Sequence, residues 1–288
     1  MISPYVRRLR LGRELTQLRK RAGLTHAKLA ARTGLSQSKI SRLESGPYRP
    51  DQGDVIRVLD GLEVPENGER HQILTIAQEA AGRGWWESIP MDARQALYAA
   101  LEAGAVAIRE YQDTVIPGLL QTPQYTKAVA ANDDLSFGAD TSAPDVATRA
   151  RAERQRMLRL NGATYEVIVD EVVIRRLSVP PNVHVAELRH LAANSGTASV
   201  RILPVDARID AYTVPRSPFS LYSFGDPKDP RVAAVDTVTS DLILVDEGEV
   251  ERYEHLYCRL RKAALSPEDS AYLLAKAADE MEVSGHGV

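Results

Sequence analysis

The sequence predicts an all-α N-terminal domain of about five helices, followed by an α/β or α+β C-terminal domain. Through residue 82, apolar residues recur mostly every three or four positions, as on amphipathic helices. Beyond residue 84, short β-branched or alternating segments are interspersed with helical ones. Residues 1–63 carry thirteen Lys and Arg against six Asp and Glu, whereas the rest carries 23 and 33. A basic N-terminal segment therefore precedes an acidic one.

The chain is long enough for two domains that each bury a core. It has 288 residues, of which 44% are hydrophobic and 26% charged, the usual mixture of a folded protein. The stretch GRGWWESIP interrupts the helical pattern near Gly84. We therefore expect one domain over residues 1–83 and a second over residues 84–288.

Targeting and cysteine content favour a cytoplasmic protein. The N-terminal stretch lacks the apolar core of a signal peptide, and no segment approaches the roughly 18 apolar residues of a membrane helix. Cys258 is the only cysteine, which excludes an intramolecular disulfide and a multi-cysteine zinc site.

The N-terminal helices have recognisable beginnings and ends. Thr25 and Ser36 stand where a side-chain oxygen caps the next helix, and Gly34 supplies the left-handed backbone of a tight turn between helices. We expect helices over residues 4–21, 26–33, 36–45, a segment including 55–62, and 67–82.

The C-terminal domain shows both strand and helix patterns. We expect strands over residues 164–170, 198–203, 219–224, 231–237 and 241–246. We expect helices over residues 122–133, 144–160, 183–195, 248–264 and 267–282.

The segment from Thr25 to Arg49 has the pattern of a helix-turn-helix. Buried aliphatic positions such as Ile40 and Leu43 let two short helices cross, so that the second can enter a DNA major groove. Amide, hydroxyl and guanidinium groups suit base edges there. The candidate base-contacting residues are Gln37, Ser38, Ser41 and Arg42.

Other residues around this motif suit phosphates. The N-terminus of the helix after Thr25 attracts anions, and basic side chains surround it. The candidate phosphate-contacting residues are Thr25, His26, Lys28, Lys39, Tyr48 and Arg49, of which Tyr48 could instead pack on the core. The alternative, a solvated bundle surface, does not account for the positive charge in the same sixty residues.

The run LSQSKISRLESG, followed by a proline, resembles the recognition-helix signature of the Cro/phage-repressor-like XRE family, a resemblance that covers residues 13–63. It implies base contacts by Gln37, Ser38 and Arg42, and a buried or structural carboxylate at Glu44. His26 stands where the family usually has Gln.

The rest of the chain resembles the C-terminal domain of actinobacterial XRE regulators, sometimes called Scr1-type antitoxin-like. The matching stretches are RGWWESIP, REYQDTVIPGLLQTPQY, RQRMLRL, the strand that ends in Asp170 and Glu171, and AALSPEDS. This resemblance implies a cytoplasmic DNA-binding regulator, often encoded beside a very small partner protein.

Two segments of the second domain are candidate partner or ligand surfaces. Adjacent tryptophans could stack on a ligand or pack at a domain junction, and the run before Gln121 could line a groove or form a buried turn. The candidate residues are Trp85, Trp86, Pro117, Gly118, Leu119 and Leu120.

The sequence contains no catalytic motif that we recognise. Acidic residues follow several strands and could bind a metal, but Asp and Glu commonly serve there as turn or cap residues; they are Asp170, Glu171, Asp206, Asp236 and Asp246. His255 and Cys258 make at most two metal ligands. We therefore expect no enzyme activity, no cofactor and no metal site.

Two functions remain. The first is a sequence-specific transcriptional regulator that binds double-stranded DNA as a homodimer, because one small module reads too few bases for genomic specificity. The second is an antitoxin-like protein whose C-terminal domain binds a small protein encoded by a neighbouring gene, with DNA binding serving autoregulation. Both can hold together.

Overall fold

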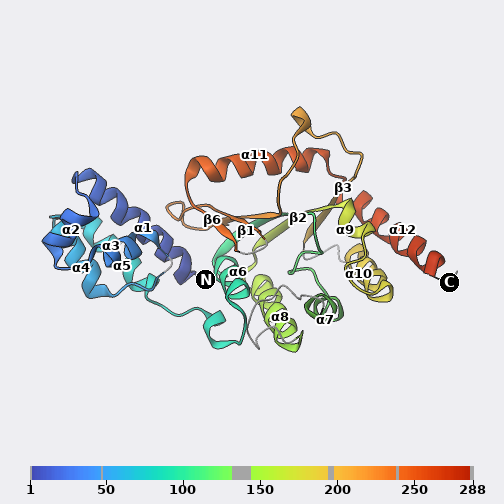
Figure 1. Ribbon diagram of the computed structural model, residues 1–288, viewed down its shortest axis with the longest axis horizontal. Coiled ribbons are helices and arrows are strands. Elements are labelled where there is room, and N and C mark those ends of the chain that lie inside the picture. The colour runs from blue at the N-terminus through green and yellow to red at the C-terminus, as the bar shows by residue number, and fades with distance from the viewer. Residues whose placement is uncertain (1, 47, 132–143, 194–197, 238–239, 286–288) are drawn as a thin grey trace. The chain divides into compact units, whose positions relative to one another are not determined.

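The computed structural model describes residues 2–46, 48–131, 144–193, 198–237 and 240–285, and it divides the chain into two compact units (Figure 1). The first unit comprises Met1–Ser88, Ala99–Gly104 and Phe224–Pro230. The second comprises Ile89–Tyr98, Ala105–Ser223 and Arg231–Val288. The domain limits expected from the sequence stay a prediction.

The first unit contains the five predicted helices. They are α1 (Pro4–Arg21), α2 (His26–Thr33), α3 (Gln37–Ser45), α4 (Gln52–Gly61) and α5 (Gly68–Ala80). Each begins after a residue whose side chain accepts a backbone N–H of the first turn; these caps are Ser3, Thr25, Ser36, Asp51 and Asn67. The proline after Gly46, part of the sequence signature, lies outside the described residues.

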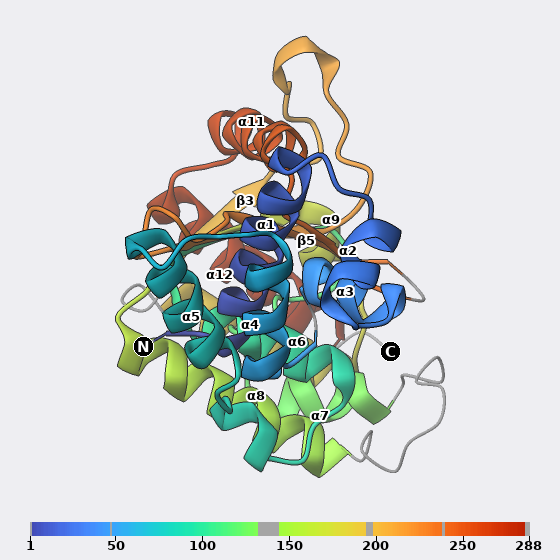
Figure 2. The same cartoon turned by 90° about the vertical axis from the view of Figure 1, so that its left-hand side faces the viewer.

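The core of this unit forms where the helices face one another (Figure 2). Leu15 of α1, Leu29 of α2 and Ile40 of α3 are each at most 1% exposed. Burial of one such side chain contributes about 1.5–3 kcal/mol to folding. The recognition-helix candidate is therefore fixed on its inner side.

The second unit is built on a six-stranded mixed sheet of order β3-β2-β1-β4-β5-β6. β1, β2 and β3 pair in parallel, whereas β4, β5 and β6 pair antiparallel. The strands are β1 (Ala105–Gln112), β2 (Thr164–Asp170), β3 (Ser199–Leu203), β4 (Phe219–Phe224), β5 (Val232–Val235) and β6 (Leu242–Leu244). Of the two classes that the sequence left open, the domain is α+β.

Helices precede, connect and follow these strands. They are α6 (Ala93–Glu102), α7 (Pro123–Ala131), α8 (Pro144–Asn161), α9 (Glu171–Arg175), α10 (Pro181–Ala193), α11 (Glu247–Ala263) and α12 (Pro267–Gly285). In Figure 1, α11 lies over one face of the sheet, and α7, α8 and α10 lie on the other side. The last positions of two predicted helices, 132–133 and 194–195, fall outside the described residues.

One core of the second unit lies between the sheet and α11. Tyr111 of β1, Ile168 of β2 and Phe219 of β4 belong to the same buried cluster as Tyr257 and Leu260 of α11. Residues of one strand alternate between faces, so Glu110 and Gln112 point away from this cluster. Both are buried nevertheless.

The sequence analysis missed β1, which pairs in parallel with β2 and lies next to β4 in the sheet. Its run AVAIREYQ carries two charges and an amide, which conceal the apolar pattern of a buried strand. The structure satisfies those charges: Arg109 pairs with Glu254 at 2.8 Å, and Glu110 accepts a 2.7 Å hydrogen bond from Tyr165. These partners, distant in sequence, help to make the strand compatible with burial.

Candidate nucleic-acid interface

The helix-turn-helix is formed by α2, the turn at Gly34 and α3 (Figure 2). Thr25 caps α2 by accepting the N–H of Lys28 at 3.2 Å, and Ser36 caps α3 by accepting the N–H of Lys39 at 3.2 Å. Gly34 has φ 69° and ψ 10°, the left-handed conformation predicted for the turn. Local chemistry therefore fixes where α3 begins.

The four candidate base readers lie on the outer side of α3. Gln37, Ser38, Ser41 and Arg42 are all exposed. Their spacing of i, i+1, i+4 and i+5 places them along one helical face, away from the buried Ile40. The guanidinium carbon of Arg42 lies 5.6 Å from the centre of the Tyr48 ring.

Two of the candidate phosphate contacts already hold carboxylates. Lys39 Nζ lies 2.6 Å from Oδ2 of Asp54, whose side chain is 2% exposed. Arg49 Nη2 lies 2.6 Å from Oε2 of Glu87. A DNA phosphate at either position must therefore compete with an ion pair. A count of charged residues in the sequence could not reveal these pairs.

The remaining phosphate candidates have different surroundings. Thr25 and Lys28 are exposed at the start of α2, where the helix dipole favours an anion. Tyr48 is 55% exposed, so it is not the core residue that one interpretation allowed. His26 Nε2 lies 3.1 Å from Oε2 of Glu44.

Glu44 is the polar centre of the motif. Its side chain is 6% exposed and accepts two 2.7 Å hydrogen bonds from Arg19 and one of 3.0 Å from Thr16. Burial alone would raise the pKa of Glu44, but the hydrogen bonds from Arg19, His26 and Thr16 outweigh burial and hold that pKa below its ordinary value. The carboxylate thus links α1 and α2 to the end of α3.

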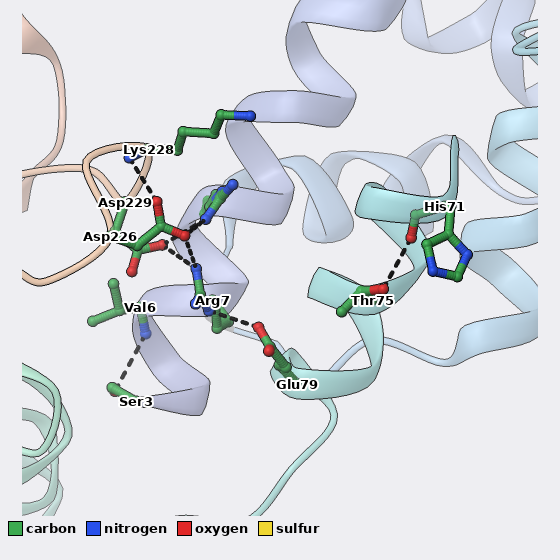
Figure 3. A network of polar contacts seen from close by, with 10 residues as sticks. Ser3, Val6, Arg7, His71, Thr75, Glu79, Asp226, Lys228 and Asp229 are labelled. Atoms are coloured by element: carbon green, nitrogen blue, oxygen red, sulfur yellow. Dashed lines mark hydrogen bonds and ion pairs between the residues drawn. The ribbon is translucent and has the colours of Figure 1, made fainter. Parts of the chain in front are cut away.

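A second charged network involves two arginines of α1 (Figure 3). Arg7 contacts Asp229 at 2.6 Å and Glu79 of α5 at 2.7 Å, and Arg10 contacts Asp226 at 2.6 Å. Asp226 and Asp229 belong to the segment 224–230 of the first unit. Both arginines are 7% exposed, so they add to the formal charge of the N-terminal segment but not to its exposed basic surface.

Sequence reasoning missed this network because two of its acidic partners, Asp226 and Asp229, are more than 200 residues away along the chain. A local signal exists only within segment 224–230, where Asp226 accepts the backbone N–H of Lys228. This hydrogen bond, then those from Arg10 and Arg7, lowers the pKa of Asp226 to about 2. Asp226 therefore stays ionised to a lower pH than an ordinary aspartate, whose pKa is 3.8.

The candidate partner or ligand residues are mostly covered. Trp86 is 8% exposed and meets Trp85 edge to face, with ring centres 6.1 Å apart. Leu119 and Leu120 are 8% and 4% exposed. Pro117 is buried and Gly118 is half-buried. This burial favours the packing interpretation for both segments.

Of the acidic residues after the strands, two are helix caps, whereas Asp236 accepts a hydrogen bond from Tyr98, 138 residues away along the chain. Asp170 caps α9 and Asp246 caps α11 through backbone N–H groups. Within the described ranges, no group of three or more His, Cys, Asp and Glu side chains is arranged to hold a metal ion. Nor does any helix among these residues combine the length and apolar character needed to cross a membrane.

Comparison with known families agrees with this arrangement. A family model described as a helix-turn-helix domain matches residues 10–72, which include α2, its turn and α3. This match indicates a DNA-binding protein with a regulatory role. No curated protein and no solved structure matches the chain. The model described as domain of unknown function DUF5753 matches residues 95–276, more than half of the chain, and the protein therefore belongs to the DUF5753 family.

Proposed function

We propose that this protein is a sequence-specific, DNA-binding transcriptional regulator that inserts α3 into the major groove. The observation that carries the proposal is the exposed row Gln37, Ser38, Ser41 and Arg42, supported from behind by a buried helical face. A helix fixed on its inner side can present these groups to base edges without first becoming ordered. The protein acts by binding, not by catalysis.

The outward side chains have distinct roles in this proposal. The Gln37 amide offers adenine a donor and an acceptor, and the Arg42 guanidinium offers guanine two donors. Ser38 and Ser41 serve either base. The start of α2 at Thr25 and His26, together with Lys28, Lys39 and Arg49, contacts phosphates and fixes the register.

A homodimer supplies the specificity that one module lacks. α3 has nine residues and is therefore about 13 Å long. That length spans about four base pairs at about 3.4 Å each, and a genome contains far too many such sites. Two copies on a two-half-site operator double the sequence that is read.

The first test compares DNA from upstream of the gene with shuffled DNA in titrations at about 50 mM and 200 mM salt. Gln37→Ala and Arg42→Ala should each cost about 1–3 kcal/mol of discrimination at one base position. Arg49→Ala should weaken binding to both DNAs alike. Arg189→Ala, which removes an exposed arginine from α10, is the control.

Two outcomes would contradict the proposal. If the protein binds both DNAs alike at the higher salt, it is not a sequence-specific regulator of this target. If all three interface variants lose equal affinity on both DNAs, α3 contacts DNA without reading its sequence.

A second proposal is that the C-terminal domain binds a small protein, as an antitoxin does. The observation behind it is the connection between β3 and β4, in which Tyr212, Val214 and Val205 are 93%, 77% and 74% exposed. Ala211 and Tyr212 have φ of 58° and 53°, a conformation that side-chain-bearing residues seldom adopt. Exposed apolar groups on a strained connection suit a protein partner.

Co-purification with the products of the adjacent genes tests this second proposal. Tyr212→Ser should abolish capture of a small partner. Tyr272→Ser, at a 73% exposed tyrosine of α12, should leave it intact. If no adjacent product is retained, or if both variants behave alike, this role is wrong.

A further inference from the structure

The side chain of Arg42 is held by an aromatic ring. Its guanidinium carbon lies 5.6 Å from the centre of the Tyr48 ring, within the distance of a cation–π interaction. Arg42 is in the last turn of α3, and Tyr48 follows the end of that helix. Both side chains are exposed, so this contact lies on the surface rather than in the core.

Gly46 and Arg49, on either side of Tyr48 in the sequence, each have close contacts within the first unit. Gly46 has φ 89°, so it ends the helix in the left-handed conformation that glycine favours. A Cβ at Gly46 would lie 3.1 Å from Cα and Cδ2 of Leu9, so the end of α3 packs closely against α1. The next residue after Tyr48, Arg49, is tied to Glu87 at 2.6 Å. Tyr48 therefore lies, in sequence, between two residues that contact other parts of the first unit.

An aromatic ring and a carboxylate differ in how far they leave a cationic side chain free to bind DNA. The carboxylates that hold Lys39 and Arg49 offset the positive charge and occupy N–H donors. A ring has no net charge, so it does not offset the charge of the guanidinium. Among the described residues no carboxylate pairs with Arg42, so its N–H donors are not taken by an ion pair and can donate the paired hydrogen bonds to guanine.

We propose that Tyr48 is a positioning residue that holds Arg42 for guanine recognition and thereby contributes to sequence specificity. This inference rests on the proposed function of α3. The ring restricts the Arg42 side chain before DNA arrives, so less rotamer freedom is lost on binding. Exclusion of water by the DNA strengthens the contact further.

The test measures discrimination across a set of operators in which each base pair is changed in turn. Arg42→Ala identifies the base pair at which discrimination disappears. Tyr48→Ala should lower discrimination at that same base pair by about 3-fold to 30-fold and nowhere else. Tyr48→Phe keeps the aromatic ring and should therefore keep the discrimination of the native protein at that base pair. Tyr272→Ala, at an exposed tyrosine of α12, is the matched control.

A second measurement needs no DNA. In the free protein, the ring current of Tyr48 should shift the NMR signal of the Arg42 Nε–H group. We expect this shift in the native chain and in Tyr48→Phe, and its loss in Tyr48→Ala. An unchanged Arg42 signal in Tyr48→Ala would show that the two side chains are not in contact and would overturn the inference.

The outcomes separate this inference from the proposed function. Loss of discrimination in Arg42→Ala but not in Tyr48→Ala overturns the positioning role while α3 remains the reading helix. Equal affinity losses on all operators for Tyr48→Ala and Tyr48→Phe assign the hydroxyl to a phosphate instead, which also overturns it. A native protein that does not discriminate between operators contradicts the proposed function itself.

Discussion

At the scale of single residues, α3, the proposed reading helix, is held by the carboxylate of Glu44, which does not need to contact DNA. Glu44 closes α3 onto α1 through Arg19 and Thr16 and onto α2 through His26. The resemblance to the XRE family led us to expect a buried or structural carboxylate here. The sequence could not identify its partners, because they lie 18 to 28 residues away along the chain.

Glu44→Gln should destabilise the first unit by about 3 kcal/mol, the low end of the cost of removing one partner from a buried ion pair. The change leaves the guanidinium of Arg19, whose side chain is 11% exposed, without its charged partner. Hydrogen exchange of peptides from α1 and α3 in the full chain measures the effect. His26→Ala is the control, because this side chain is 41% exposed and should matter less. Equal protection in the native chain and in Glu44→Gln would contradict the prediction.

The same carboxylate predicts a response to acid. The pKa of Glu44 is lower in the folded chain than its ordinary value of 4.5. The ionised carboxylate therefore makes its full contribution to the free energy of unfolding above pH 4.5. It is lost as the pH falls through the lowered pKa of the folded state. Calorimetry below about pH 4.5 should therefore show less acid destabilisation in Glu44→Gln than in the native chain. Identical pH profiles would disprove this link.

At the scale of elements, helix packing sets the position of α3 as firmly as its caps do. Gly12 lies in the middle of α1 beside the end of α3. A Cβ on this residue would lie 2.4 Å from the backbone oxygen of Glu44, closer than real Cβ contacts come. The glycine therefore permits α1 and α3 to approach each other closely. The sequence pattern predicted only an amphipathic helix here and did not predict this contact.

The substitution Gly12→Ala has two opposing effects on the free energy of unfolding. In an isolated helix, alanine is favoured over glycine by about 1 kcal/mol. Here the forced separation of backbones should dominate and destabilise the unit by about 1–3 kcal/mol, with weaker operator binding as α3 shifts. Gly68→Ala is the matched control, because its added Cβ meets nothing within 4 Å and the change should be neutral or stabilising. Thermal unfolding and operator titration measure both effects, and a stabilised Gly12→Ala would refute the close approach.

Elements with local signals were predictable, and those that depend on distant partners were not. The caps and turn of α2 and α3 are set by residues within four positions, so sequence patterns predicted them. β2 and β4 have the predicted limits because their apolar runs end in turn residues. β1 was missed because its charged residues Arg109 and Glu110 have partners, Glu254 and Tyr165, on elements distant in sequence. For the same reason, the sequence did not predict the ion pairs of Lys39 and Arg49.

At the scale of the whole molecule, net charge is a poor measure of what the protein offers to DNA. The formal charge of residues 1–63 includes Arg7 and Arg10, which hold Asp226 and Asp229. Lys39 and Arg49 are also paired with carboxylates. Binding by one copy should therefore be weak, so that two copies are needed for a stable complex.

The homodimer proposal fixes the geometry of the operator. Two α3 helices related by a twofold axis enter successive major grooves about 34–36 Å apart, which is about 10 base pairs. Inserting five base pairs between the half-sites turns one half-site to the opposite side of the duplex. Affinity should then fall by about 100-fold, because the second copy no longer gains from the first.

Inserting ten base pairs is the matched control, because it restores the rotational phase and should recover part of the affinity. Both predictions are tested by footprinting the full chain on the native operator and on the two insertion operators. The mass of each complex, measured in parallel, gives the number of bound copies. Two copies on the native operator and one on the five-base-pair insertion support a dimer formed across half-sites. A single copy on all three, with equal affinity, means that one α3 reads the site alone, and the extra specificity must then come from a partner bound to the C-terminal domain.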